Sequence, residues 1–82
     1  MLVRIFYSMT ICDLKRGARA VVLKVEGEVA VRERLHSYGL FAGAKIVLLR
    51  VSLFKKTYLL QVGGTRVALE KAIAAGIRVW NT

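Results

Sequence analysis

The sequence predicts a small, mainly β domain: a barrel of about five short strands with one short helix. Short stretches rich in Val, Ile, Leu and Tyr recur along the 82 residues, and turns containing glycine separate them. One segment, 28–38, instead repeats its apolar residues at helical spacing. Closing such apolar strands into a barrel removes the unpaired edges that they would otherwise expose. Periodicity leaves two alternatives open, an open sheet covered by the helix and an oligonucleotide-binding barrel.

The strand assignments rest on β-prone composition and on the turns between them. The loop 52–56 joins two strands as a hairpin, and Gly63-Gly64 makes the next tight turn. A short turn at 72–76 leads into the last strand, and a short segment at 10–14, with Asp13 able to cap a turn, precedes the first. The expected strands are 18–25, 44–51, 57–62, 65–69 and 77–80.

The helix is expected to begin near Val29 and to stop at Gly39. Val31, Leu35 and Tyr38 recur at spacings of four and three residues, which places them on one apolar stripe. Glu28 suits the positive end of the helix dipole. The residues expected on the outer face are Arg32, Glu33 and His36.

The turn after the helix carries two glycines. Gly39 falls just past the last helical turn, where glycine takes the left-handed conformation with little steric strain. Leu40 can then fold back onto the helix, and Gly43 follows three residues later, directly before a strand. The segment therefore reads as helix, tight turn and strand with little slack.

Composition points to a chain with surplus apolar and basic surface. Hydrophobic residues make up 56% of the chain, and Lys and Arg outnumber Asp and Glu by 14 to 5, a net charge of +9. A domain of this size buries only about two-thirds of its surface, so some apolar material is expected outside the core. An acidic protein, a membrane surface or nucleic acid would each complement the charge, whereas cations spread for solubility would need no partner.

Little in the sequence indicates catalysis. The chain has one histidine and one cysteine, His36 and Cys12, and no motif pairs a nucleophile with a base. His36 with Glu33 is too small a set to close a metal site, so no metal or cofactor is expected. Cys12 is expected to be a partly buried, unreactive thiol, and a single cysteine fits a cytoplasmic protein. No segment is long and apolar enough for a membrane span of about 20 residues.

Five aromatic side chains are candidates for a binding platform or for the core. Core packing is expected for most of them, whereas Phe41 and Phe54 are the best candidates for exposure because both fall in loops. Phe54 is followed directly by Lys55-Lys56. The five are Tyr38, Phe41, Phe54, Tyr58 and Trp80.

An ordered set of spacings from Thr10 onward resembles the FeoA family. The motifs that carry the resemblance are Asp13-Leu14-x-x-Gly17, Ala20-x-Val22, Gly27, Arg32-x-Arg34-Leu35-x-x-x-Gly39-Leu40-x-x-Gly43, Ile46, Val62-x-Gly64, Val67-Ala68-Leu69, Ala74 and Ile77-x-Val79. The family pattern has proline before the second turn glycine, where this chain has Ala42. The resemblance implies an SH3-like barrel in a small cytoplasmic accessory protein of ferrous iron uptake. The partner it implies is the cytoplasmic domain of a FeoB-type membrane permease.

The resemblance and the surplus surface together suggest docking rather than chemistry. The expected contact face joins the helix and its following turn to the loop at 52–56, through Arg32, Arg34, Leu40, Phe41, Phe54, Lys55 and Lys56. Two alternatives remain, a nucleic-acid-binding barrel and a metal-responsive regulatory domain or homo-oligomer. Residues 1–82 are expected to form one domain with an N-terminal extension at 1–9, whose apolar residues 1–8 are expected to pack on the barrel or on a second subunit.

Overall fold

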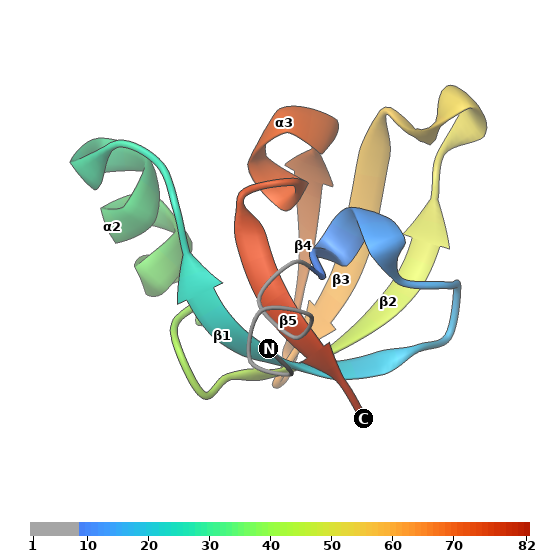
Figure 1. Cartoon of the computed structure of the whole chain (residues 1–82), viewed down its shortest axis with the longest axis horizontal. Helices are drawn as coiled ribbons and strands as arrows, with labels where there is room; N and C mark the ends of the chain where they lie inside the picture. The colour runs from blue at the N-terminus through green and yellow to red at the C-terminus, as the bar shows by residue number, and fades with distance from the viewer. Residues whose placement is uncertain (1–8) are drawn as a thin grey trace, which may run out of the picture.

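Five antiparallel strands form one sheet in the order β4-β3-β2-β1-β5, as Figure 1 shows. The structure is a computed structural model and describes residues 9–82. All five expected strands are present, with ends that differ by at most one residue. They are β1 (Arg19–Val25), β2 (Lys45–Val51), β3 (Thr57–Val62), β4 (Thr65–Glu70) and β5 (Ile77–Asn81).

Two bulges bend the sheet around its core. Val22 pairs with Val79 and Lys24 with Arg78, so Leu23 is an extra residue in β1. The same irregularity separates Leu48 from Arg50, which leaves Leu49 extra in β2. A bulge increases the local twist and turns the strand. The sheet therefore curls into a small barrel instead of lying flat (Figure 1).

The core lies inside the curl and draws on every strand. Successive strand residues point to opposite faces, so alternate residues of each strand are buried. Leu48, Leu60, Ile77 and Val79 are fully inaccessible to solvent. The other buried apolar residues are Ile11, Leu14, Ala20, Val22, Leu35, Leu40, Ile46, Tyr58, Val62, Val67, Leu69 and Ala74.

The helix α2 (Val29–Ser37) lies beside β1 and covers no face of the sheet (Figure 1). Leu35 is its one buried residue. The glycine-closed turn is confirmed: Gly39 has a φ of 93°, its N–H donates to the His36 carbonyl, and the Leu40 N–H donates to the Leu35 carbonyl. This pair of hydrogen bonds is the Schellman motif, which brings Leu40 against the last helical turn.

The prediction that Tyr38 belongs to the buried apolar stripe of the helix is wrong. Tyr38 is the C-cap residue and its side chain is 44% exposed, whereas Val31 is half-buried. The reason is the left-handed turn at Gly39, which places Leu40 in the core where a continued helical stripe would have placed Tyr38. Arg32, Glu33 and His36 lie outside, as expected.

The remaining helical elements are short. The expected turn at 72–76 contains a one-turn helix, α3 (Lys71–Ala74), and two 3-10 turns are η1 (Ile11–Asp13) and η2 (Leu53–Lys55). Among residues 9–82, no helix has the length and apolar character needed to cross a membrane.

The chain before β1 is tied to the last strand. Asp13 caps η1 as expected, because its carboxylate accepts a hydrogen bond from the Thr10 N–H at 2.8 Å while the Thr10 hydroxyl accepts one from the Cys12 N–H. The Met9 carbonyl accepts a hydrogen bond from Val79. The expected packing of residues 1–8 lies outside the described residues.

Tyr58 is the large polar side chain of the core. It is 2% exposed, and burial raises the pKa of its hydroxyl above the usual 10.0, with a further contribution from the neighbouring Cys12 thiol. Cys12 is half-buried, as expected, and its Sγ lies 3.7 Å from the Lys71 carbonyl oxygen.

Replacing Gly39 tests the turn that fixes α2. In Gly39→Ala, the backbone keeps a φ that L-residues rarely adopt, and the new Cβ lies 3.1 Å from Cγ1 of Val62. We expect the free energy of unfolding to fall by about 1–2 kcal/mol in a denaturant titration. Gly64→Ala is the matched control, because Gly64 has no such φ and open space around it. Equal stability of the two variants would contradict the account of the turn.

Candidate docking surfaces

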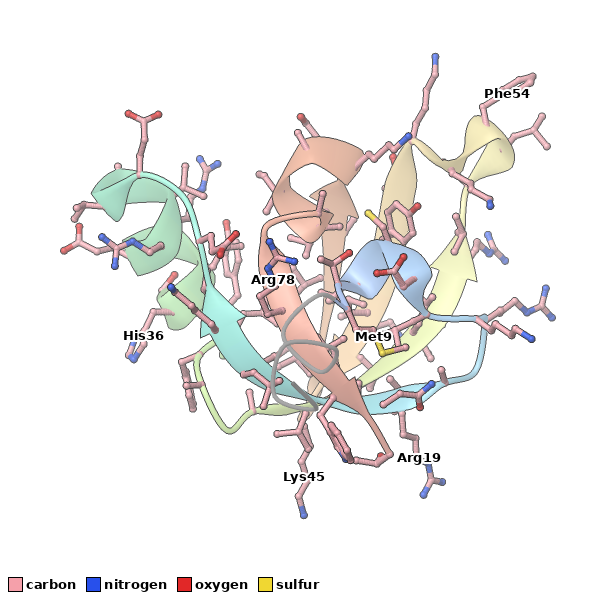
Figure 2. All side chains as sticks on the ribbon, viewed as in Figure 1. Met9, Arg19, His36, Lys45, Phe54 and Arg78 are labelled. Atoms are coloured by element: carbon pink, nitrogen blue, oxygen red, sulfur yellow. The ribbon has the colours of Figure 1, made fainter. Side chains whose placement is uncertain are left out.

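The expected contact residues divide between two ends of the molecule. The molecule measures 33 × 27 × 23 Å, and α2 with its turn lies at one end of the longest axis. The η2 loop lies at the other end, as the positions of His36 and Phe54 in Figure 2 show. The single face expected from the sequence is therefore two separate surfaces, because the curled sheet holds the helix and the β2–β3 loop apart.

The first surface, the α2 face, is the exposed end of the molecule formed by α2 and its turn. Arg32 and His36 lie on one side of the helix, Arg34 and Tyr38 lie on the other, and Phe41 lies in the turn. All five are exposed. The rings of His36 and Phe41 are 4.9 Å apart between centroids and inclined at 43°, so they support one another. The guanidinium of Arg32 donates from Nε to the Gly27 carbonyl at 3.1 Å. The face therefore combines aromatic and cationic side chains, the residue types enriched at protein interfaces.

The backbone fixes the position of Phe41. The Ala44 N–H donates to the Phe41 carbonyl at 2.9 Å, which closes a tight turn. The same turn is tied to β1, because the Gly43 N–H donates to the Val22 carbonyl at 2.7 Å. The loop that carries Phe41 is therefore fixed by backbone hydrogen bonds, although the residue is 44% exposed.

Hollows lie on both sides of the α2 face. A cavity of about 460 Å³ beside Phe41 is lined by Gly39, Phe41, Gly43, Ala44, Lys45, Val62 and Gly63. A smaller one, about 250 Å³, lies between Tyr38 and the start of β4, with Arg66 in its wall. Each could receive a side chain of a partner protein, as the pockets around interface hot spots do.

The prediction that Leu40 is a contact residue is wrong. Its side chain is 1% exposed, because the left-handed turn at Gly39 returns the chain to the core, where Leu35 is also buried. Its role is to hold the α2 face on the core. The sequence pattern that predicts the turn also predicts that Leu40 is buried. The prediction of the turn and the prediction of Leu40 as a contact residue are therefore incompatible.

The expectation for the aromatic residues is half correct. Phe41 and Phe54 are exposed, as expected, but so are Tyr38 and Trp80, and only Tyr58 of the five is buried. Tyr38 leaves the core because the helix ends there, and Trp80 lies near the end of an edge strand.

The second surface, the Phe54 loop, consists of residues 52–56. Leu53 and Phe54 are each 81% exposed, and Figure 2 shows Phe54 pointing away from the sheet. Phe54 and Lys55 both have left-handed backbones, with φ of 62° and 54°. This conformation is a genuine outlier for a bulky residue such as Phe.

Ser52 holds the loop in this shape. Its hydroxyl accepts hydrogen bonds from the N–H groups of Lys56 at 3.2 Å and Thr57 at 2.9 Å. Its carbonyl accepts another from Lys55. The Lys56 carbonyl in turn accepts one from Lys71 at the start of α3, so the loop is anchored at both ends.

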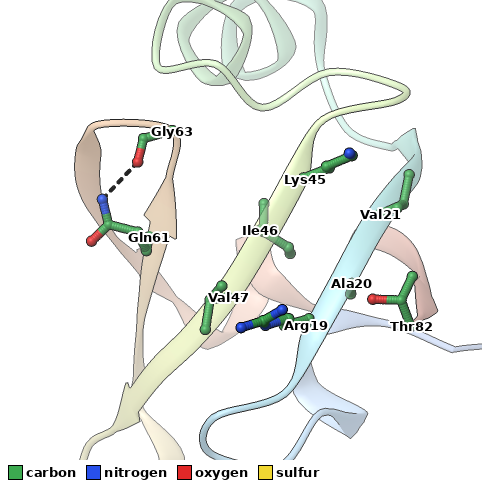
Figure 3. A pocket seen from close by; sticks show the side chains of 9 residues that line it. All are labelled: Arg19, Ala20, Val21, Lys45, Ile46, Val47, Gln61, Gly63 and Thr82. Carbon is green, nitrogen blue, oxygen red and sulfur yellow. Dashed lines mark hydrogen bonds between the residues drawn. The ribbon is translucent and has the colours of Figure 1, made fainter.

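A third hollow, which sequence reasoning missed, lies on β1, β2 and β3 (Figure 3). Its volume is about 510 Å³, and two cationic residues, Arg19 and Lys45, line it together with apolar strand residues. The Gln61 side chain donates to the Gly63 carbonyl at 2.7 Å in its wall. Only the strand register brings Arg19 close to Lys45, so no sequence pattern could have shown this. The lining residues are Arg19, Ala20, Val21, Lys45, Ile46, Val47, Gln61, Gly63 and Thr82.

Among residues 9–82, no three His, Cys, Asp or Glu side chains come together in a way that could hold a metal ion. The His36 ring instead lies in tilted contact with the Phe41 ring. The described surfaces offer shape, apolar area and positive charge, which are properties of binding surfaces.

The left-handed backbone of Phe54 yields a stability prediction. The left-handed conformation costs an ordinary L-residue about 1–2 kcal/mol, and asparagine tolerates it better. Because the ring is exposed, Phe54→Asn is expected to raise the free energy of unfolding by about 0.5–1 kcal/mol, a gain of a few degrees in the midpoint of thermal unfolding. Leu53→Asn, equally exposed but without a positive φ, is the control and should give no gain. A loss of stability in Phe54→Asn would contradict the assignment of strain.

Comparison with known proteins places these surfaces on a known fold. The FeoA domain model matches residues 9–80. The FeoA protein from Chlorobium tepidum is 36% identical and superposes with a TM-score of 0.85, over 89% of this chain and 70% of that one. The structure described as an iron uptake regulatory protein (FeoA) is 27% identical with a TM-score of 0.79, over 90% and 96% of the two chains.

A repressor also contains a similar domain. The manganese-activated repressor ScaR is 26% identical with a TM-score of 0.79, but the match covers 90% of this chain and only 35% of the repressor. The search of curated protein sequences gives no significant match. The family match spans all five strands, α2 and the glycine turn, and its solved members share the barrel. This chain, with its mainly β, SH3-like fold, therefore belongs to the FeoA domain family.

Proposed function

We propose that this protein is an accessory protein of ferrous iron uptake, acting by docking its α2 face on the cytoplasmic domain of a FeoB-type permease. Family membership supports the link to iron transport, since a solved relative from Clostridium thermocellum is described as iron(II) transport protein A. The observation that carries the docking is the α2 face itself: exposed rings and guanidinium groups beside a hollow.

The attachment of α2 suits it to this role. One buried residue, Leu35, and the buried Leu40 hold the helix on the barrel, while its charged face stays in solvent. Phe41 and Tyr38 flank the helix end and offer rigid apolar area with few rotatable bonds to immobilise. Docking would therefore cost the protein little conformational entropy.

Charge supports an acidic partner surface. The net charge of +9 favours encounter with a negatively charged protein at a rate that falls as salt rises. Arg32 and Arg34 carry one guanidinium group on each side of α2, and guanidinium binds carboxylates in a bidentate manner.

The test is a titration of the purified cytoplasmic domain of the permease with this protein. Phe41→Ser, and separately Arg32→Glu with Arg34→Glu, are expected to weaken binding by about 10- to 30-fold, the effect of losing an interface anchor. The matched control is Lys15→Glu with Arg16→Glu, an equal charge reversal in exposed residues between η1 and β1. An equal loss of binding affinity in the control would mean that the effect of the α2 substitutions comes from net charge alone. Absence of binding by the folded wild-type protein would overturn the proposal.

The same variants connect binding to transport. Cells lacking the protein should take up less ferrous iron, and the wild-type chain should restore uptake better than Phe41→Ser does. Restoration by Phe41→Ser to the wild-type level would separate uptake from the α2 face.

The similarity to ScaR supports a second candidate, a regulatory domain that responds to metal. Its test is calorimetric titration of the protein with Mn(II) and Fe(II) under reducing, anaerobic conditions. The docking proposal expects no binding tighter than millimolar. Micromolar binding would favour the regulatory role.

A further inference from the structure

The Phe54 loop presents a convex apolar tip. Leu53 and Phe54 are adjacent and each 81% exposed, at the end of the β2–β3 hairpin that projects beyond the sheet (Figure 1). Single exposed apolar residues are ordinary on protein surfaces, but an adjacent pair at a projecting tip is not explained by folding.

The backbone holds this tip outward at an energetic cost. The left-handed conformations of Phe54 and Lys55 turn the chain so that the ring faces solvent, and Ser52 fixes the turn by three hydrogen bonds. Glycine or asparagine would relieve the strain without disturbing the core. Strain retained around an exposed ring points to a binding role for that ring.

Cations surround the tip. Arg50, Lys55 and Lys56 lie in the hairpin end, and Lys71 hydrogen-bonds through its backbone to Lys56; all four side chains are exposed. The carboxylate on these elements is Glu70, which pairs with Thr57 across the two strands. Long lysine stems can lie along an apolar surface while their ammonium groups reach a charged layer above it.

A projecting apolar pair in a ring of cations is complementary to an anionic lipid surface. The interface of a bilayer accepts a convex apolar tip without a preformed pocket, and acidic headgroups attract the flanking lysines. A protein partner would need a hollow of matching shape on its own surface to receive this tip, whereas a bilayer interface needs none.

We propose that the Phe54 loop is a membrane-surface anchor that inserts Leu53 and Phe54 into the interface of a bilayer rich in anionic phospholipid. Lys55 and Lys56 contact the headgroups. The proposal is independent of permease docking, because it requires lipid alone and lies at the opposite end of the molecule from the α2 face (Figure 2).

Cosedimentation of the full chain with vesicles tests the proposal. We expect binding to vesicles of phosphatidylcholine mixed with phosphatidylglycerol, and little binding to phosphatidylcholine alone. Leu53→Ser with Phe54→Ser should lower the partition coefficient by about tenfold, because bound apolar area is lost. Lys55→Gln with Lys56→Gln should lower it by about fivefold for each cation. No binding by the wild type, or unchanged binding by the serine variant, would overturn the proposal.

Fluorescence locates the inserted residue. Trp80 is the only tryptophan, so Trp80→Phe with Phe54→Trp places a single indole at the tip. Its emission should shift to the blue on adding anionic vesicles and should be quenched by brominated lipid. Trp80→Phe with Phe41→Trp is the matched control, with its indole on the α2 face, and should not shift. A shift in the control alone would assign the membrane contact to the other end.

The competing occupant is an acidic protein. If the serine variant keeps its vesicle binding but loses binding to the cytoplasmic domain of the permease, the loop is a protein contact and the membrane proposal fails. Far-ultraviolet circular dichroism of every variant establishes that it is folded before binding is compared.

Discussion

The left-handed turn at Gly39 determines how the helix joins the barrel. Without it, the chain could not reverse after Tyr38 and return Leu40 to the core. The two hydrogen bonds of the Schellman motif satisfy helix carbonyls that would otherwise lack partners, so the turn serves both packing and hydrogen bonding. The turn that returns Leu40 to the core leaves the next residue, Phe41, at the surface, where its ring lies against that of His36. The α2 face therefore owes its aromatic centre to the turn.

Local physical rules account for what the sequence revealed. Alternation of apolar residues and glycine placement set the five strands to within a residue of their ends, because each depends only on near neighbours in the chain. The helix end at Gly39 and the cap at Asp13 follow from backbone chemistry at single positions. The family motifs are also short local patterns, and they indicated the SH3-like barrel.

The relative positions of the docking surfaces could not be predicted from local sequence patterns. Whether Phe41 and Phe54 share a face depends on how sharply the sheet curls, and the curl depends on bulges at Leu23 and Leu49 that leave no mark in the hydrophobic pattern. The hollow between Arg19 and Lys45 depends likewise on strand register. The assignment of Leu40 to a contact face was wrong for a different reason. Its apolar character suits a partner as well as a core, but the glycine turn visible in the sequence already indicates that Leu40 folds back onto the helix.

The strand order has a consequence for how the chain folds. β2, β3 and β4 are consecutive in sequence and pair as neighbours, so their hairpins close short loops. β5 instead pairs with β1, which lies almost a whole domain away in sequence. Closing this long loop costs more conformational entropy than closing a hairpin, and the stabilising contacts form only after it is closed. We infer that the three-stranded meander assembles first and that the C-terminal strand docks last. Until β5 docks, the side chains that it helps to bury, such as Val22 opposite Val79, stay accessible to solvent, and such transiently exposed apolar surface promotes aggregation.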